Sequence, residues 1–177
     1  MGKRSNFERV ERDFYPTPIS AVVPLVPYLP QDFYYVEPCA GDGRLIDNLK
    51  TLTNGVCINA TDIEPHLDKG ISKEDALTIK WDTHKHNTYC ITNPPWDRNT
   101  LHPLIENFIA SGKTWLLFDA DWMHTRQAIP YLKYCKTIVS VGRVKWIEGS
   151  KNTGKDNCAW YLFDLKNKTA TEFFGRL

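Results

Sequence analysis

The stretch Phe33-Tyr34-Tyr35-Val36-Glu37-Pro38-Cys39-Ala40-Gly41-Asp42-Gly43 joins a strand-forming run to a turn with two glycines, and a helical pattern follows at residues 44–49. Glycine lets the backbone turn tightly and approach a ligand without a Cβ clash. Free N–H groups at the start of a helix bind a carboxylate or a phosphate. Ile46 stands where the dinucleotide-binding fingerprint needs a third glycine. The stretch predicts an α/β protein with a ligand site at the end of a strand.

The rest of the chain alternates between strand and helix patterns. Further strands are predicted at residues 56–61, 89–92, 114–118, 136–141 and 158–165, with a weak strand before Glu74, and helices at residues 101–110 and 122–134. Such alternation is typical of a mostly parallel sheet covered on both faces. Residues 158–165 are expected to run antiparallel, because a hairpin-like polar loop rather than a crossover helix leads into them.

Prolines mark the segment before the first strand. Thr17 and Pro18 predict the start of a helix with Thr17 as its N-cap. Pro24 and Pro27 predict that this helix is short or kinked. A length of 177 residues favours a single domain, 1–177, in which residues 1–30 form an N-terminal arm.

The composition excludes several classes of protein. The chain is 42% hydrophobic and 24% charged, which is ordinary globular usage rather than that of a disordered or fibrous protein. No apolar stretch approaches the ~20 residues that span a bilayer, and no secretion segment follows the N-terminus. The five cysteines form neither a Cys-x-x-Cys pair nor a zinc spacing. We therefore expect a soluble, cytoplasmic protein with reduced thiols. The net charge of +1 means that a nucleic-acid ligand would need a local basic face.

Two acidic residues follow the next predicted strands. Asp62 comes about 20 residues after the glycine turn, at a strand end, where an acid can bind both hydroxyls of a ribose. Asp75 ends the following unit and can accept a hydrogen bond from an adenine amino group. Taken alone, each acid is also typical of a helix N-cap or of a solvent-exposed residue. The ordered set favours a nucleoside-binding site.

The motif Asn93-Pro94-Pro95-Trp96 ends the strand predicted at residues 89–92. Two consecutive prolines fix φ and remove two backbone donors, which leaves main-chain carbonyls as acceptors. Asn93 adds a side-chain oxygen, and Trp96 offers a flat surface for a base or another planar amide. The motif is suited to receive an NH₂ group and to hold its lone pair toward an electrophile. The alternative is a rigid turn with an exposed tryptophan.

Together these motifs resemble those of the class I S-adenosylmethionine-dependent amino-methyltransferases, in particular the small phage and bacterial DNA adenine-N6 methyltransferases. The resemblance runs from Asp13 to about Phe118, and more loosely to Phe163. Residues 13–18 are similar to the family's N-terminal cofactor motif, 37–43 to its glycine loop, Asp62 to its ribose acid, 75–77 to its adenine-contacting segment and 93–96 to its catalytic tetrapeptide. The resemblance implies a three-layer α/β fold with a seven-stranded, mostly parallel sheet whose last strand is antiparallel.

The resemblance also implies the site residues and the chemistry. S-adenosylmethionine would be bound by the residues at the strand ends and in the arm: Tyr15, Pro16, Thr17, Glu37, Cys39, Ala40, Gly41, Gly43, Asp62, Ile63, Asp75, Ala76 and Asn93. The catalytic residues would be Asn93, Pro94, Pro95 and Trp96, with the amino group of a flipped adenine bonded to the Asn93 side chain and the Pro94 carbonyl, and with Trp96 stacked on its ring. The conjugated nitrogen would attack the methyl group in line, with positioning as the main source of catalysis. No metal is implied.

Contacts to nucleic acid are expected from short segments, because no separate target-recognition domain is expected within residues 1–177. One candidate is the loop at residues 142–157, which carries Arg143, Lys145, Lys151 and Lys155 around Trp146. A second candidate is the basic N-terminus, with Lys3, Arg4, Arg9 and Arg12. A solvated loop of mixed charge is the alternative for both. His84 and His86 lack a carboxylate or cysteine partner and are expected to be surface residues.

Three hypotheses follow. The favoured one is a DNA adenine-N6 methyltransferase in the cytoplasm of a bacterium or an infected host cell. The second keeps the chemistry and changes the acceptor to an RNA adenine, a DNA cytosine N4 or a protein glutamine. Glutamine-modifying relatives usually carry Tyr after the two prolines, so Trp96 favours a base. The third is a non-catalytic cofactor- or nucleic-acid-binding protein, against which the intact motifs argue.

Overall fold

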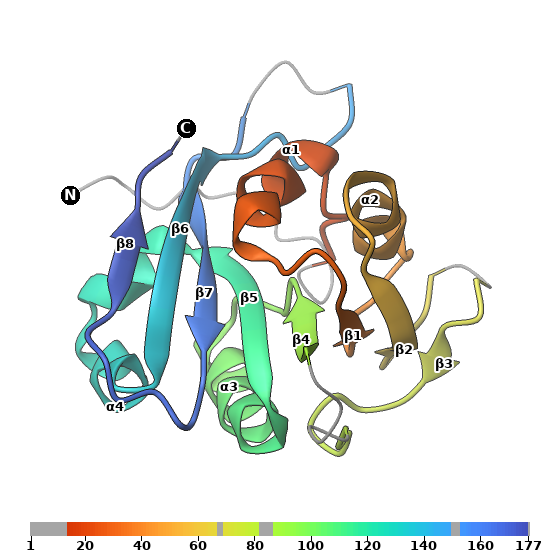
Figure 1. Ribbon diagram of the computed structural model, residues 1–177. Coiled ribbons are helices and arrows are strands. Elements are labelled where there is room, and N and C mark those ends of the chain that lie inside the picture. Colours follow the sequence, from red (N-terminus) through yellow and green to blue (C-terminus); the bar gives the residue numbers. More distant parts are fainter. Residues whose placement is uncertain (1–13, 67–68, 82–86, 150–152, 177) are drawn as a thin grey trace.

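The computed structural model describes residues 14–66, 69–81, 87–149 and 153–176. A single twisted sheet runs through the molecule, with helices on both of its faces (Figure 1). Its eight strands have the order β3-β2-β1-β4-β5-β7-β6-β8. In chain order they are β1 (Tyr34–Glu37), β2 (Val56–Asp62), β3 (Ser72–Lys73), β4 (Thr88–Thr92), β5 (Lys113–Asp119), β6 (Cys135–Arg143), β7 (Asn157–Phe163) and β8 (Glu172–Phe174).

The strand directions confirm the predicted mostly parallel sheet. β3, β2, β1, β4 and β5 pair in parallel, whereas β7 runs antiparallel to both β5 and β6. The predicted antiparallel strand is therefore confirmed. The sheet has eight strands rather than seven, because β8 adds a parallel strand at the edge beside β6. Three residues are too few to give a strand pattern in the sequence, which is why β8 was not predicted.

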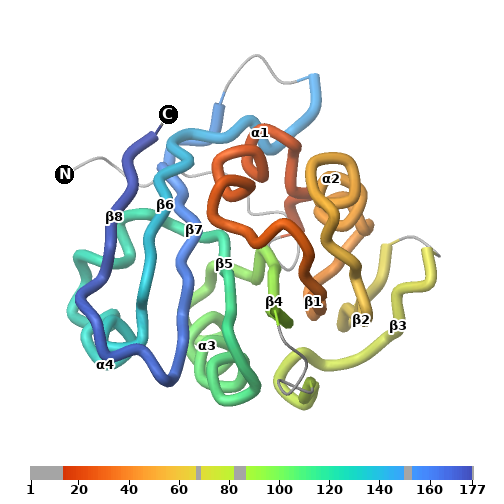
Figure 2. Tube along the Cα trace, viewed as in Figure 1, coloured from red at the N-terminus to blue at the C-terminus, as the bar shows by residue number. Residues whose placement is uncertain are grey.

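Helices cover the sheet on two sides (Figure 2). One layer contains α1 (Ile19–Val22), η2 (Val23–Tyr28) and α2 (Arg44–Leu52); the other contains α3 (Arg98–Ser111), η3 (Ala120–His124), η4 (Arg126–Ala128) and α4 (Ile129–Leu132). Successive residues of a strand point to opposite faces. Accordingly, Trp115 and Leu117 of β5 pack in the layer of α1 and α2, whereas Leu116 and Phe118 pack in the layer of α3. The expected burial of both sheet faces is confirmed.

The helix in the arm that precedes β1 is as short as its prolines predict. Pro24 lies in the first turn of η2, which begins at Val23, and Pro27 lies inside it, so α1 spans only Ile19–Val22. The predicted N-cap role of Thr17 is wrong, because Pro18 is the N-cap residue and no side chain caps α1. The arm is held to the sheet where the buried Trp160 indole donates to the Ala21 carbonyl, at 2.8 Å.

The helix predicted at residues 122–134 is broken into the short turns η3, η4 and α4. Thr125 has an extended backbone between the first two turns, and Pro130 is the second residue of α4. Trp122 is buried and donates to His102 of α3 through its indole, at 3.0 Å. Packing of this aromatic side chain overrides the helical pattern. None of the helices within the described ranges has the length and apolar character needed to cross a membrane.

Candidate cofactor and base site

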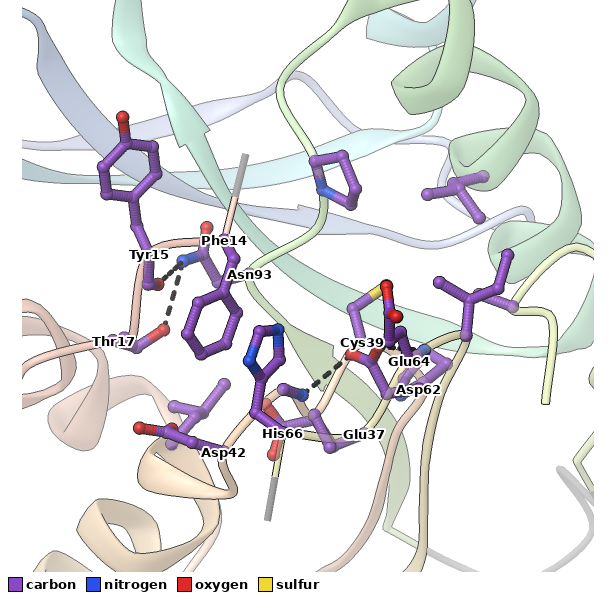
Figure 3. Close-up of a pocket in the computed structure, with 18 of the residues that line it drawn as sticks. Phe14, Tyr15, Thr17, Glu37, Cys39, Asp42, Asp62, Glu64, His66 and Asn93 are labelled. Carbon is purple, nitrogen blue, oxygen red and sulfur yellow. Dashed lines mark hydrogen bonds between the residues drawn. The ribbon is translucent and has the colours of Figure 1, made fainter. Parts of the chain in front are cut away.

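A cavity of about 240 Å³ lies at the carboxyl ends of β1, β2 and β4, beside the arm. Figure 3 shows side chains from these strand ends and from the arm converging on it. All of the residues predicted to bind a cofactor line this cavity except Gly43. Gly43 is instead the N-cap residue of α2, with φ +75°. The structure thus brings together in one hollow residues that lie far apart in the sequence.

The glycine turn is shaped by close contact with the arm. Gly41 has φ +54°, and a Cβ at this position would lie 2.6 Å from Cε2 of Phe14. Both features favour glycine. The main-chain N–H of Gly41 donates to Oδ2 of Asp62 at 2.8 Å, and Oδ1 of Asp42 accepts from the N–H of Arg44 at 3.0 Å. The turn is therefore fixed by β2 on one side and by the start of α2 on the other.

The two predicted nucleoside acids lie next to each other along the cavity wall. Asp62 accepts the Gly41 N–H through Oδ2 and the Glu64 N–H through Oδ1, at 2.8 Å each. Asp75 accepts the Leu77 N–H through Oδ1 at 2.9 Å. Each carboxylate oxygen has more than one lone-pair direction. Both acids can therefore shape their turns and still accept bonds from a ligand.

Glu37 is a buried acid with unused hydrogen-bonding capacity. It is 2% exposed and lines the cavity at the end of β1. Its Oε2 has no hydrogen-bond partner among the described residues. Burial, followed by the negative charges of Asp62, Asp42 and Asp47, raises the pKa of Glu37 well above its ordinary value. A ligand cation beside Glu37 would both pair this oxygen and favour the ionised carboxylate.

The predicted catalytic motif begins at the end of β4. Nδ2 of Asn93 donates to the Tyr15 carbonyl at 3.3 Å and to Oγ1 of Thr17 at 3.1 Å, and Oδ1 accepts from Nε1 of Trp96 at 3.1 Å. Asn93 (Figure 3) and Pro95 line the cavity, whereas Pro94 is buried and Trp96 is half-buried. The motif thus borders the same cavity as the glycine turn.

The β6–β7 loop reaches this motif through an aromatic cluster. Trp146 lies edge-on to Trp96, with ring centroids 5.6 Å apart, and 6.3 Å from the ring of Tyr15. The Trp96 and Trp146 rings lie at 84° to each other. The ring of Trp146 therefore lies next to the motif that begins with Asn93.

The basic residues predicted to bind nucleic acid surround the same loop. Arg143, Lys145 and Lys155 are exposed. Glu148 of the loop lies 3.9 Å from Arg44 at the start of α2. Lys151, like the four basic residues of the N-terminus and the two histidines at 84 and 86, falls outside the described residues.

Several cavity residues were missed by the sequence analysis: Phe14, Pro38, Asp42, Leu45, Glu64, His66, Leu77, Thr100 and Leu104. The rings of Phe14 and His66 are stacked, with their centroids 3.7 Å apart and 12° between their planes. The main-chain N–H of His66 donates to the Gly41 carbonyl. Figure 3 shows this pair across the middle of the cavity. Phe14 belongs to the arm motif and so had a sequence signal, whereas the place of His66 follows from the fold alone.

Among the described residues, no group of three or more His, Cys, Asp or Glu side chains could hold a metal ion. The five cysteines are free thiols. Burial raises the pKa of the cavity-lining Cys39, so its thiol stays protonated rather than nucleophilic.

Comparison with known proteins places the fold. No protein-family model and no curated protein sequence matches the chain. Among solved structures, it is similar to a type I restriction-modification methyltransferase subunit from Streptococcus thermophilus, with a TM-score of 0.58 and 10% identity over 91% of this chain and 47% of that one. It is also similar to the 23S rRNA methyltransferase ErmE, with a TM-score of 0.56 and 13% identity over 84% and 68% of the two chains.

A third similar structure is a Listeria monocytogenes protein assigned to the class I S-adenosylmethionine-dependent methyltransferases. The TM-score is 0.57 at 10% identity, over 96% of this chain and 68% of that one. These likenesses show the fold: the chain has the Rossmann-like fold of the class I methyltransferases, as the sequence predicts. The chain spans about half of the restriction-modification subunit and about two thirds of the other two proteins.

Proposed function

We propose that this protein transfers a methyl group from S-adenosylmethionine to the exocyclic amino group of adenine in DNA. The observation that carries the proposal is the position of Asn93. Its side-chain amide lies at a strand end, borders the cavity that holds the glycine turn, and is joined to the half-buried ring of Trp96. The side-chain oxygen proposed to accept the amine therefore borders a cavity of the size of a nucleoside.

The cavity residues fit the cofactor. The unpartnered Oε2 of Glu37 suits the ammonium of the methionine part, since a buried carboxylate gains from a cation. Asp62 would accept from the ribose hydroxyls and Asp75 from the adenine amino group, with Ile63 and Ala76 against the ring. Gly41, whose missing Cβ leaves room for the ring of Phe14, lines the same cavity. When bound, the cofactor supplies an electrophilic methyl group.

The chain's own groups position the amine. Oδ1 of Asn93 and the Pro94 carbonyl would each accept one N–H of the amino group, which turns the nitrogen lone pair toward the methyl group. Transfer forms the N–C bond and breaks the S–C bond, and the proton leaves the nitrogen for water afterwards. Trp96 and Trp146 offer ring faces for a base taken out of the stack. Arg143, Lys145, Lys151 and Lys155 would hold phosphates nearby.

An RNA adenine is the second candidate acceptor. One structure with this fold is a 23S rRNA methyltransferase, and another is a subunit of a restriction-modification system. Both names support nucleic acid as the partner. Between the two acceptors, the close likeness of the quoted motifs to those of small DNA adenine methyltransferases favours DNA.

The test is methyl transfer from labelled S-adenosylmethionine to DNA and RNA, followed by mass analysis of the nucleosides. We expect N6-methyladenine in DNA with the wild-type protein and none with Asn93→Ala, while calorimetry shows nearly unchanged cofactor affinity. Asn99→Ala is the matched control, because Asn99 is exposed in the first turn of α3. Methylated adenine in RNA alone would mean that the methyl acceptor is RNA rather than DNA. Tight nucleic-acid binding without transfer to either would overturn the enzymatic proposal.

A further inference from the structure

The two ends of the Asn93 amide face partners of opposite kind. Nδ2 lies 3.3 Å from the main-chain carbonyl of Tyr15, and Oδ1 lies 3.1 Å from the indole Nε1 of Trp96. A carbonyl can only accept a hydrogen bond and an indole N–H can only donate one. Exchanging the amide nitrogen and oxygen would therefore place two acceptors together at one end and two donors at the other. Only one orientation of Asn93 satisfies both neighbours.

We propose that the Tyr15 carbonyl and the Trp96 indole N–H are positioning groups that lock the Asn93 amide with its oxygen as the acceptor for the substrate amine. This inference rests on the proposed function and deepens it. It gives Trp96 a role that a stacking surface alone lacks, since a phenyl ring would stack without donating. It also makes the arm part of the base site.

The arm is itself held in place for this role. Thr17 is 5% exposed; its hydroxyl oxygen accepts from Nδ2 of Asn93 at 3.1 Å, and its carbonyl accepts from Nδ2 of Asn48 at 2.9 Å. Asn48 lies in α2, directly after the glycine turn. A line of hydrogen bonds therefore runs from α2 through Thr17 to Asn93 and on to Trp96. Because Thr17 can donate or accept, it follows the orientation that Tyr15 and Trp96 impose.

The lock explains why an amide, rather than a carboxylate, suits this position. A carboxylate at position 93 would set an acceptor oxygen against the Tyr15 carbonyl, where Asn93 now places a donor. Acceptor against acceptor leaves both groups unsatisfied in a half-buried site. Asp should therefore not replace Asn93 without a loss of activity.

Three variants test the lock by activity. Trp96→Phe keeps a flat ring and loses the donor, so kcat should fall about threefold to tenfold while KM for the nucleic acid changes little. Trp96→Leu, which loses the ring as well, should also raise KM. Asn93→Asp should lower kcat roughly 10- to 100-fold, whereas the exposed control Asn99→Asp should leave it unchanged. Wild-type kcat in Trp96→Phe or in Asn93→Asp would overturn the proposal.

A spectroscopic measurement tests the lock without any turnover. In ¹H–¹⁵N spectra, the Trp96 indole signal, assigned by its loss in Trp96→Phe, should show slow hydrogen exchange in the wild type. Asn93→Ala should shift this signal and speed its exchange at least about tenfold. An unchanged signal would overturn the lock. If the wild-type protein methylates no nucleic acid, the proposed function fails, while this spectrum still decides the orientation of Asn93.

Discussion

Two cavities of similar volume lie at opposite edges of the same sheet. The first, about 240 Å³, is at the carboxyl ends of the parallel strands. The second, about 230 Å³, is at their amino ends and is lined by residues of β4, β5, β7, β6 and β8. Each borders one buried polar atom without a partner among the described residues, Oε2 of Glu37 in the first and Nε1 of Trp115 in the second. Volume and unpartnered atoms alone therefore do not distinguish them.

What differs is how the polar groups reach each cavity. At the carboxyl edge, turns after the strands bring in main-chain groups and acids, of which Glu37 has three carboxylate neighbours that raise its pKa. At the amino edge, strand faces supply the floor, and the rim carries two lysines, Lys113 and Lys136, against two acids, Asp164 and Glu172. The first cavity, which we propose as the ligand site, therefore has unbalanced charge and main-chain groups from turns, whereas the charges around the second are balanced.

The largest effect should come from Asp62→Ala. This change removes the acceptor of the Gly41 N–H and the charge that would bind the ribose. Calorimetry with S-adenosylhomocysteine should show a loss of about 1.5–3 kcal/mol, roughly a 10- to 150-fold weaker affinity. Asp164→Ala is the matched control in the second cavity, because Asp164 accepts the N–H two residues ahead just as Asp62 does, at 2.9 Å against 2.8 Å. Equal losses of affinity in both variants would mean that the two cavities do not differ in their effect on cofactor binding.

Sequence patterns predicted the strand ends and their motifs because these signals are local. The glycine turn and Asn93 each follow a strand of ordinary composition within a few residues, and Asp62 is the last residue of β2. The hydrogen bond from Asn93 to Thr17, in contrast, joins residues 76 positions apart, and no local pattern pairs the two. The place of His66 beside Phe14 depends on the same kind of distant packing. Thus the residues of the site were predictable, but several of their partners were not.

The fold shows the same division between local and distant causes. Trp122 has helical spacing to its neighbours, but its burial against α3 and the extended Thr125 break the predicted helix. β8 exists only because Glu172–Phe174 can pair with β6. Both features depend on packing against segments that local periodicity does not contain.

A smaller effect should appear in the pH dependence of Glu37. Since burial and neighbouring acids raise its pKa in the fold, Glu37 stays protonated above its ordinary pKa of 4.5, where the unfolded chain is ionised. Its contribution to the free energy of unfolding is therefore fully present below pH 4.5 and is lost as the pH rises toward the folded pKa. Glu37→Gln should flatten this fall in urea unfolding between pH 5 and 8.

Cofactor binding should show the matching linkage. An ammonium beside Glu37 favours its carboxylate, so binding releases a proton and the affinity rises with pH, by at most about tenfold per pH unit, until Glu37 ionises without ligand. Glu37→Gln should remove this slope. The control Glu172→Gln, at the exposed rim of the second cavity, should keep it. A slope that persists in Glu37→Gln would assign the ammonium to another acid of the first cavity.

The smallest effect should come from Trp115→Phe in the second cavity. Trp115 is 1% exposed, and its indole N–H has no acceptor among the described residues, which costs about 1–3 kcal/mol for a buried donor. Removing the donor recovers that cost, while the smaller ring leaves unfilled space with an opposing cost of similar size. We therefore expect the free energy of unfolding to change by less than about 1 kcal/mol, with unchanged affinity for S-adenosylhomocysteine. A large loss of stability would mean that the N–H is satisfied by water bound in the cavity, which gives the second cavity a structural role and leaves ligand binding to the first.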